Sequence, residues 1–193
     1  MKGQIIPRSF FRRDPITCSR ELIGAELIWG SCAGTIVETE AYLAKNDEAC
    51  HTFTRPSTRA FLERNKPGAA YIYFSYGAHW MLNVMVKGGT ADGFVLFRAV
   101  QPTRGIRLMK KRRGTDEERQ LCSGPGKLTQ AFGITKREDE IDLCVDSRHC
   151  FVKSNVAKVD VVADLRIGIT RSVDHPWRFT LRDSEFVSRK PKR

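Results

Sequence analysis

The sequence lacks the features that mark a membrane protein, a secreted protein or a metal-cluster protein. No apolar run approaches the roughly 18 residues of a membrane span, and residues 1–7 lack the apolar core of about 7 to 15 residues found in signal peptides. The six cysteines form no Cys-x-x-Cys pair, so neither a zinc cluster nor a redox pair is indicated. We expect buried thiols, no metal and no membrane partner.

Acidic residues are scarce relative to basic ones. The chain has 33 Lys and Arg against 22 Asp and Glu, which gives a net charge of +11 and a pI near 9.7. This balance favours a polyanionic partner, and the charge alone does not choose between nucleic acid and an anionic surface. The basic tail, residues 189–193, is expected to be disordered.

The length of 193 residues and the hydrophobic content of 41% fit one core, so we interpret residues 1–193 as a single domain. Asp14-Pro15 predicts a helix from Ile16 to Ile23 that ends at Gly24. Residues 25–29 and 35–43 read as a hairpin with a loose, glycine-rich turn, and residues 44–69 read as a long surface segment.

An alternation of period two predicts a three-strand antiparallel meander over residues 71–76, 80–86 and 94–100. A basic helix is expected at 106–113, a second helix capped by Ser123 that ends at Gly133, and short strands at 159–162, 167–169 and 177–181. We therefore expect an α+β fold, with a curved, mainly antiparallel sheet, short helices around it and a hairpin protruding through Tyr76-Gly77.

All four tyrosines fall between positions 42 and 76, which indicates one aromatic site. Side chains alternate along a strand, so Glu38, Glu40 and Tyr42 share one face. The residues expected on the opposite, core face are Val37, Thr39, Ala41 and Leu43. Two carboxylates beside an aromatic ring suit a general base next to a stacked planar ligand, although a glutamate pair on an exposed strand face is commonplace.

The meander adds further aromatic groups. Tyr71, Tyr73 and Ser75 share one face, and Tyr76 precedes the turn at Gly77. A ring at a hairpin tip is placed either to enter the minor groove and fill the gap left by an extruded base or to fold back onto the sheet.

Three more side chains are candidates for binding or catalysis. Asn83 lies among apolar residues and needs hydrogen-bond partners, either a base edge or a loop. Arg98 is the only charge within Phe94–Val100, and a carboxylate such as Glu40 or a phosphate is its natural complement. His51 follows Asp47-Glu48-Ala49-Cys50, whose spacing suits a metal poorly, so we interpret it as a hydrogen-bonding group in a pocket.

These residues resemble, in kind and order, those of the alkyladenine (3-methyladenine) DNA glycosylase family of the mammalian alkyladenine glycosylase type. The similarity runs from about Pro7 to Val187. It rests on Ile36-Val37-Glu38-Thr39-Glu40-Ala41-Tyr42, the Asp47 to His51 stretch, Pro67-Gly68, Tyr71-Ile72-Tyr73, Tyr76-Gly77, Asn83, Leu96 with Arg98-Ala99, and Leu121-Cys122-Ser123-Gly124-Pro125-Gly126-Lys127-Leu128.

The resemblance implies a monofunctional enzyme of base excision repair that needs no cofactor or metal. Such an enzyme flips alkylated or otherwise damaged purines out of double-stranded DNA and hydrolyses the N-glycosidic bond, leaving an abasic site. Glu40 would be the general base that activates water, and Arg98 would hold Glu40 and lower its pKa. The residues implied to enclose the flipped base are Tyr42, His51 and Tyr73.

The same resemblance implies that Asn83 discourages unmodified guanine and that Tyr76 is inserted into the duplex. Tyr71 receives no role. Departures from the family pattern at Arg59-Ala60, Glu63-Arg64, Gln101 and Leu165 leave the lesion range open. We expect a monomer, cytoplasmic if the short amino end reflects a bacterial source and nuclear if the source is eukaryotic.

Two other interpretations remain open at this point. One is a module that binds single-stranded nucleic acid and uses Tyr71, Tyr73 and Tyr76 as a stacking platform, which leaves Glu40 without a task. The other is a helix-hairpin-helix repair enzyme built on Gly124-Pro125-Gly126-Lys127, which needs an amphipathic helix before the glycine turn.

Overall fold

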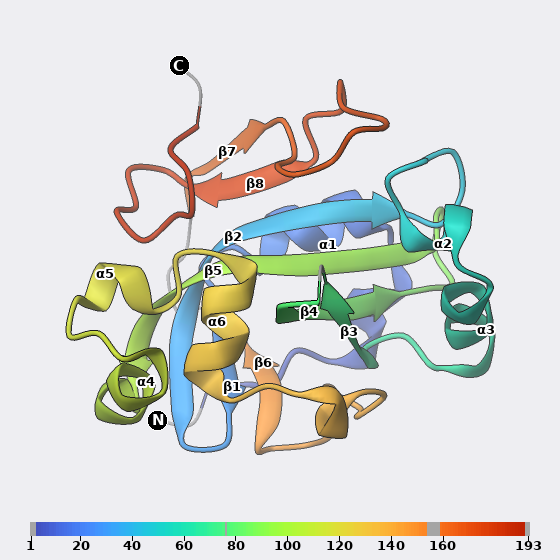
Figure 1. The fold of residues 1–193 in the computed structure, drawn as a ribbon. Helices are drawn as coiled ribbons and strands as arrows, with labels where there is room; N and C mark the ends of the chain where they lie inside the picture. Colours follow the sequence, from blue (N-terminus) through green and yellow to red (C-terminus); the bar gives the residue numbers. More distant parts are fainter. Residues whose placement is uncertain (1–2, 76, 154–158, 192–193) are drawn as a thin grey trace.

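A computed structural model describes residues 3–75, 77–153 and 159–191. Their secondary structure comes in short runs of helices and runs of strands, as expected for an α+β domain (Figure 1). The helical elements are η1 (Arg8–Arg12), α1 (Pro15–Leu22), α2 (His51–Thr54), α3 (Pro56–Arg64), α4 (Ile106–Arg113), α5 (Glu118–Leu121), α6 (Pro125–Phe132) and η2 (Lys136–Glu138). The strands are β1 (Glu26–Trp29), β2 (Cys32–Leu43), β3 (Ala70–Ser75), β4 (His79–Val86), β5 (Gly93–Arg104), β6 (His149–Val152), β7 (Val161–Asp164) and β8 (Arg178–Leu181).

The described strands form one curved antiparallel sheet of eight strands in the order β3-β4-β5-β2-β1-β6, with β8 joined to β2 and β7 joined to β8. The predicted meander is confirmed as β3, β4 and β5. α1 packs against β2 and β5, and α6 packs against β4 and β5. Figure 1 places α2 and α3 at the end of the sheet where β2 finishes. This arrangement leaves the residues of one sheet face free to form a site under α2.

The predicted start of α1 and the predicted end of α6 are confirmed, whereas the predicted N-cap of α6 is not. Asp14 accepts a hydrogen bond from the Thr17 amide at 2.8 Å and starts α1, as predicted. α6 ends at Gly133 with φ 72°, also as predicted, but its N-cap is Gly124 instead of Ser123. The backbone of Ser123 is used otherwise, in an isolated bridge with Ala99.

Three other local predictions were wrong. The hairpin of β1 and β2 turns on Gly30 and Ser31 alone, because Trp29 already pairs with Cys32. The segment 44–69 contains α2 and α3, whose start at Pro56 uses a first-turn proline. Residues 167–169 are not a strand. Gly168 has φ 78° there, a conformation that interrupts extended backbone.

The six cysteines are free thiols, and all of them are buried except the half-buried Cys144. Burial raises the pKa of Cys18 and Cys122 to about 12, so these thiols are unreactive. Among the described residues no helix is long and apolar enough to cross a membrane, and no group of three or more His, Cys, Asp or Glu side chains could hold a metal ion.

The pairing of β2 with β5 is shifted near Ala33 and again between Ile36 and Thr39, and the second irregularity changes which residues face the core. Ile36 pairs with Val100 and Thr39 pairs with Phe97, while the pairing between them is shifted. Ile36 and Ala41 both lie in the main core although they are five positions apart, an odd number that would place them on opposite faces of a regular strand. Each strand therefore carries a β-bulge, at which two consecutive side chains lie on the face away from the main core.

The residues displaced by these bulges are Val37 and Glu38 on β2, and Arg98 and Ala99 on β5. Val37 was expected to share the core face with Ala41, and that expectation is wrong, because Val37 packs with Ala99 and Val187 in a separate cluster. As a result Glu38, Glu40 and Arg98 lie side by side on the face opposite the main core.

Candidate active site

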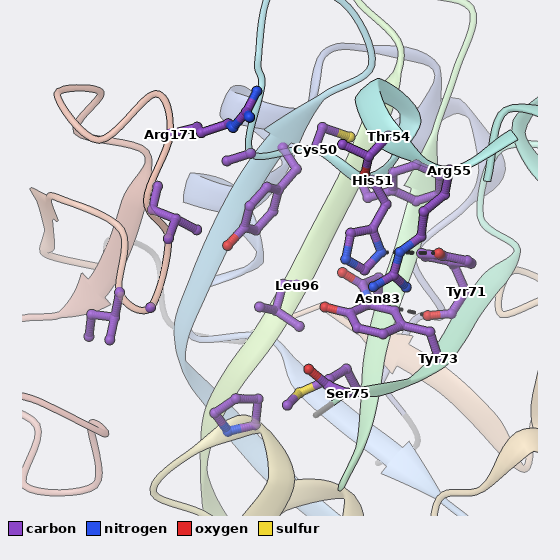
Figure 2. A pocket seen from close by; sticks show the side chains of 18 of the residues that line it. Cys50, His51, Thr54, Arg55, Tyr71, Tyr73, Ser75, Asn83, Leu96 and Arg171 are labelled. Carbon is purple, nitrogen blue, oxygen red and sulfur yellow. Dashed lines mark hydrogen bonds between the residues drawn. The ribbon is translucent and has the colours of Figure 1, made fainter. Parts of the chain in front are cut away.

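A cavity of about 580 Å³ opens on the face of the sheet that carries Glu40. Figure 2 shows His51, Tyr73 and Asn83 close together on one side of this cavity, with Arg171 on the opposite side and Leu96 between them. Side chains from α2, from the ends of β2 to β5 and from the loop 167–171 line it. They include Tyr42, Cys50, His51, Arg55, Tyr71, Tyr73, Ser75, Met81, Asn83, Phe94, Leu96, Arg98 and Ile167.

Glu40 lies behind this wall and is completely buried. Its Oε1 accepts a hydrogen bond from the Ile167 amide at 2.7 Å. Its Oε2 accepts from the Tyr42 hydroxyl at 2.8 Å and from Arg98 Nη1 at 3.3 Å. All three donors belong to residues that line the cavity, so the carboxylate is one side chain away from a bound ligand.

The charge state of Glu40 reflects two opposing effects. Burial raises its pKa above the usual glutamate value, and the positive charge of Arg98 lowers it by a smaller amount. Arg98 therefore lowers the pKa of Glu40 as expected, but burial outweighs it. The predicted pairing of Arg98 with a carboxylate is confirmed. A buried carboxylate with a raised pKa is a stronger proton acceptor than an exposed one, which suits a general base.

Tyr42 and Arg98 keep defined protonation states next to Glu40. Burial, followed by the charge of Glu40, raises the pKa of Tyr42 well above 10, so its hydroxyl remains a donor. Burial lowers the pKa of Arg98, but the carboxylates of Glu40 and Glu38 outweigh this effect and raise it. The Tyr42 ring has the Arg166 guanidinium 4.7 Å from its centroid.

His51 starts α2 and stands edge-on to Tyr73, with ring centroids 4.3 Å apart. Burial, with a contribution from Arg55, lowers the pKa of His51 to about 4, so the ring is neutral at pH 7. A neutral imidazole does not repel a cationic ligand, and it retains one donor and one acceptor nitrogen.

Tyr71 has a role that the sequence did not reveal. Its hydroxyl lies 3.2 Å from His51 Nδ1, a contact drawn as a dashed line in Figure 2. The same hydroxyl lies 2.8 Å from Thr58 Oγ1. Its ring packs against Phe61 and Phe94, with centroid distances of 4.9 and 4.8 Å. Tyr71, itself part of the cavity wall, therefore fixes the orientation of His51.

Asn83 lies on β4 with 3% of its surface exposed and lines the cavity. Its Nδ2 donates to the Tyr71 carbonyl at 3.2 Å, a partner of the kind that its burial requires. This bond uses the amide nitrogen and leaves Oδ1 for a ligand. The predicted wedge, Tyr76, lies outside the described residues.

Sequence reasoning missed two residues beside Tyr42 and Glu40. Arg166 forms an ion pair with Asp47 across 119 positions of sequence, and Ile167 contributes its backbone amide to Glu40. A backbone donor leaves no mark in a sequence, and the only signal of the Arg166 pair is a charge directly between two apolar residues, Leu165 and Ile167. The departures at Gln101 and Leu165 fall on exposed positions outside the cavity.

Comparison with known proteins identifies the family of this chain. Residues 9–185 match the family model described as methylpurine-DNA glycosylase. The chain belongs to the methylpurine-DNA glycosylase family. Its members are hydrolases that cleave N-glycosidic bonds in DNA repair, so this chain is a DNA glycosylase with DNA as its substrate.

Several bacterial relatives in the methylpurine-DNA glycosylase family carry the provisional name 3-methyladenine DNA glycosylase. One from Rhodopseudomonas palustris is 44% identical over 187 residues, which cover 97% of this chain and 89% of the relative. One from Rhizobium meliloti is 45% identical, covering 94% of this chain and 95% of the relative. One from Agrobacterium fabrum is 45% identical, with coverage of 96% and 93%.

The two alternative interpretations, the stacking module and the helix-hairpin-helix enzyme, are both rejected. A non-catalytic stacking module is set aside because the family consists of enzymes. The helix-hairpin-helix interpretation was wrong, since the helix before the glycine turn, α5, has only four residues. In addition, the three tyrosines that the structure describes all line one cavity instead of being dispersed.

Proposed function

We propose that this enzyme is a monofunctional glycosylase that flips alkylated or otherwise damaged purines out of duplex DNA. In this proposal Glu40 activates the water that attacks the sugar carbon as the base leaves, and the product is an abasic site. The observation that carries the proposal is the buried Glu40 carboxylate behind a cavity lined by Tyr42, His51 and Tyr73. We also propose that it acts as a monomer in the cytoplasm, since the relatives described above are bacterial.

The attacking water is assigned to the space between Arg98 and Ile167. Both residues line the cavity, and both donate hydrogen bonds to Glu40. A water placed there can pass its proton to Glu40 while its oxygen approaches the sugar. The raised pKa of Glu40 predicts that the rate falls on the acidic side at a pH above the usual glutamate range.

Recognition of the base is assigned to the rings. A purine alkylated at a ring nitrogen is cationic, and a cation against aromatic faces gains about 0.5 to 2 kcal/mol over a neutral base. The neutral state of His51 removes a repulsion that an imidazolium would impose. Asn83 is assigned to reject unmodified guanine, and Tyr76 to fill the space that the flipped base leaves in the stack.

The deciding experiment uses a duplex with one methylated purine or hypoxanthine and measures abasic sites under single-turnover conditions. Glu40→Gln should bind the duplex as the wild type does and release base about 100 to 10,000 times more slowly, the usual contribution of a general base. A panel of methylpurine, hypoxanthine and etheno-adenine duplexes would then define the lesion range. Unchanged release by Glu40→Gln would refute the assignment of Glu40.

A further inference from the structure

Glu38 is a second carboxylate that is completely buried next to Glu40, and the proposed reaction does not use it. Its Oε1 accepts hydrogen bonds from Arg98 Nε at 3.0 Å and from Arg178 Nε at 2.7 Å. Arg98 therefore spans both glutamates, since its Nη1 reaches Glu40 Oε2 at 3.3 Å. Glu38 therefore both holds Arg98 in place and competes with Glu40 for the hydrogen bonds that Arg98 donates.

The remaining donors to Glu38 come from the C-terminal segment, residues 186–189, coloured red in Figure 1. The Ser188 amide donates to Glu38 Oε2 at 2.6 Å, and the Ser188 hydroxyl donates to Oε1 at 2.8 Å. The expectation of a disordered tail is wrong for Arg189, whose carbonyl accepts a hydrogen bond from Arg178 Nη2. This segment lies beyond residues 9–185, which match the family model.

The C-terminal segment is also anchored by apolar contacts. Val187 is 9% exposed and packs with Val37 and Ala99, the bulge residues that neighbour Glu38 and Arg98. The bulges therefore present an apolar surface for Val187 and a carboxylate for Ser188 at the same place. Both contacts hold the segment directly behind the pair of Arg98 and Glu40.

On the basis of the proposed function, we propose that Ser188 is a positioning residue that keeps Arg98 beside Glu40 by supplying hydrogen bonds to Glu38. The reason is a competition for donors. Without the two Ser188 bonds, Glu38 Oε2 is left without a described partner in a buried site, and a buried acceptor must find another donor. Arg178 already donates to Asp164 and to the Arg189 carbonyl, so the donor that can turn is the Arg98 guanidinium, which presents several N–H groups in a fixed fork.

The charges around Glu40 set the sign of the expected effect. The groups that face it are Arg98 on β5, Tyr42 and Glu38 on β2, and the Ile167 amide. Behind Glu38, Arg178 on β8 also pairs with Asp164 at 2.9 Å and cannot move to Glu40 without breaking that pair. Turning Arg98 toward Glu38 therefore removes positive charge from Glu40 and favours its protonated form.

The test compares Ser188→Pro, which removes both the amide hydrogen and the hydroxyl, with Ser188→Ala, which removes the hydroxyl alone. The matched controls are Ser184→Ala, a serine in the same terminal region, and Arg189→Ala, which removes a tail charge and keeps the backbone carbonyl bound by Arg178. Each variant is assayed for base release from pH 5 to 9 at saturating enzyme, and duplex binding and thermal unfolding are measured in parallel.

We expect Ser188→Pro to move the acidic limb of the rate profile upward by about one pH unit, the lower end of the effect of a neighbouring charge. The rate at low pH then falls about tenfold, while the alkaline plateau and duplex binding stay unchanged. Ser188→Ala should show a smaller shift in the same direction, and the two controls should show none. A uniform loss of rate at every pH would overturn the proposal, because it indicates a structural role only.

A second readout does not depend on activity. In protein labelled with ¹³C at the glutamate carboxyl, the Glu40 signal is identified by its absence in Glu40→Gln, and its titration midpoint is compared between wild type and Ser188→Pro. A higher midpoint in the variant supports the proposal, and an equal midpoint overturns it. If the wild type releases no base, the proposed function fails, while this titration still decides the role of Ser188. If Ser188→Pro does not fold, the same comparison is made with Ser188→Ala.

Discussion

Asp47 and Arg166 form a bidentate ion pair in the interior of the protein. Arg166 Nη1 lies 2.7 Å from Asp47 Oδ2, and Nη2 lies 2.8 Å from Oδ1, with both side chains completely buried. The pair joins the loop before α2 to the loop before Ile167, and these loops line the cavity. It also places a guanidinium against the Tyr42 ring, so it supports an aromatic wall of the site.

Asp47→Asn should lower the free energy of unfolding by about 3 to 5 kcal/mol, because it leaves the buried Arg166 charge without its counter-ion. The measurement is urea denaturation at pH 7. Glu48→Gln is the matched control, since Glu48 pairs with Arg171 in a neighbouring but exposed position, where the side chains are 53% and 58% exposed. That control should change stability by less than about 1 kcal/mol. Equal effects of the two substitutions would contradict this account.

Tyr42→Ala and Tyr76→Ala should affect different steps. Loss of the Tyr42 ring should weaken recognition of the flipped base, while loss of the Tyr76 ring should reduce the flipped population itself. Stacking on an aromatic ring contributes about 1 to 3 kcal/mol per base, so each change should cost about five- to 150-fold in its own step. Stopped-flow fluorescence of an etheno-adenine duplex separates flipping from later steps. The same kinetic defect in both variants would argue against separate roles.

Tyr71→Phe keeps the packed ring and removes the hydroxyl that meets His51 and Thr58. Because those two groups lose a partner inside the protein, we expect a loss of about 1 to 3 kcal/mol in the free energy of unfolding. Base release should fall as well, since His51 is no longer held. A double-mutant cycle with Thr58→Val checks the contact, and the two effects should be clearly non-additive. Strict additivity would mean that the hydroxyl pair is not coupled.

The pH dependence of stability should carry a contribution from His51. Its pKa is lowered from 6.5 to about 4 in the folded protein, so the unfolded chain binds more protons between these values. The stabilising contribution is complete above about pH 6.5 and is lost as the pH falls toward about 4. Urea titrations of wild type and His51→Gln at several pH values measure it. Parallel curves for the two proteins across that window would show that His51 does not titrate as described.

The sequence predicted the sheet face of the site well because strand alternation is a local property. The period of two placed Glu40 with Tyr42, and Tyr71 with Tyr73, on faces that the structure brings to one cavity. Alternation failed at Val37, where the bulge reverses the face. Bulges depend on the partner strand and on what packs against them, so a single strand read alone does not reveal them.

The contacts that hold Glu40 were harder to predict because they join distant parts of the chain. Arg98 was found from its isolation within an apolar strand, which required a buried partner. The amide of Ile167 and the two donors of Ser188 gave no comparable signal, because a backbone group is present at every position and serine is common at surfaces. The helices between residues 51 and 64 were missed for a related reason, since few of their side chains are apolar.

The matched bulges in β2 and β5 have a consequence for how such a site is gained or lost. The pairing register is the same on both sides of the irregularity, with Thr35 opposite Gln101 and Thr39 opposite Phe97. The two extra residues cancel each other, so from Gly34 to Leu43 the ladder on either side of the bulges is that of a regular strand pair. Two single-codon insertions, one in each strand, are therefore the smallest genetic change that would turn a regular antiparallel strand pair of this kind into one that sets Glu38 against Arg98.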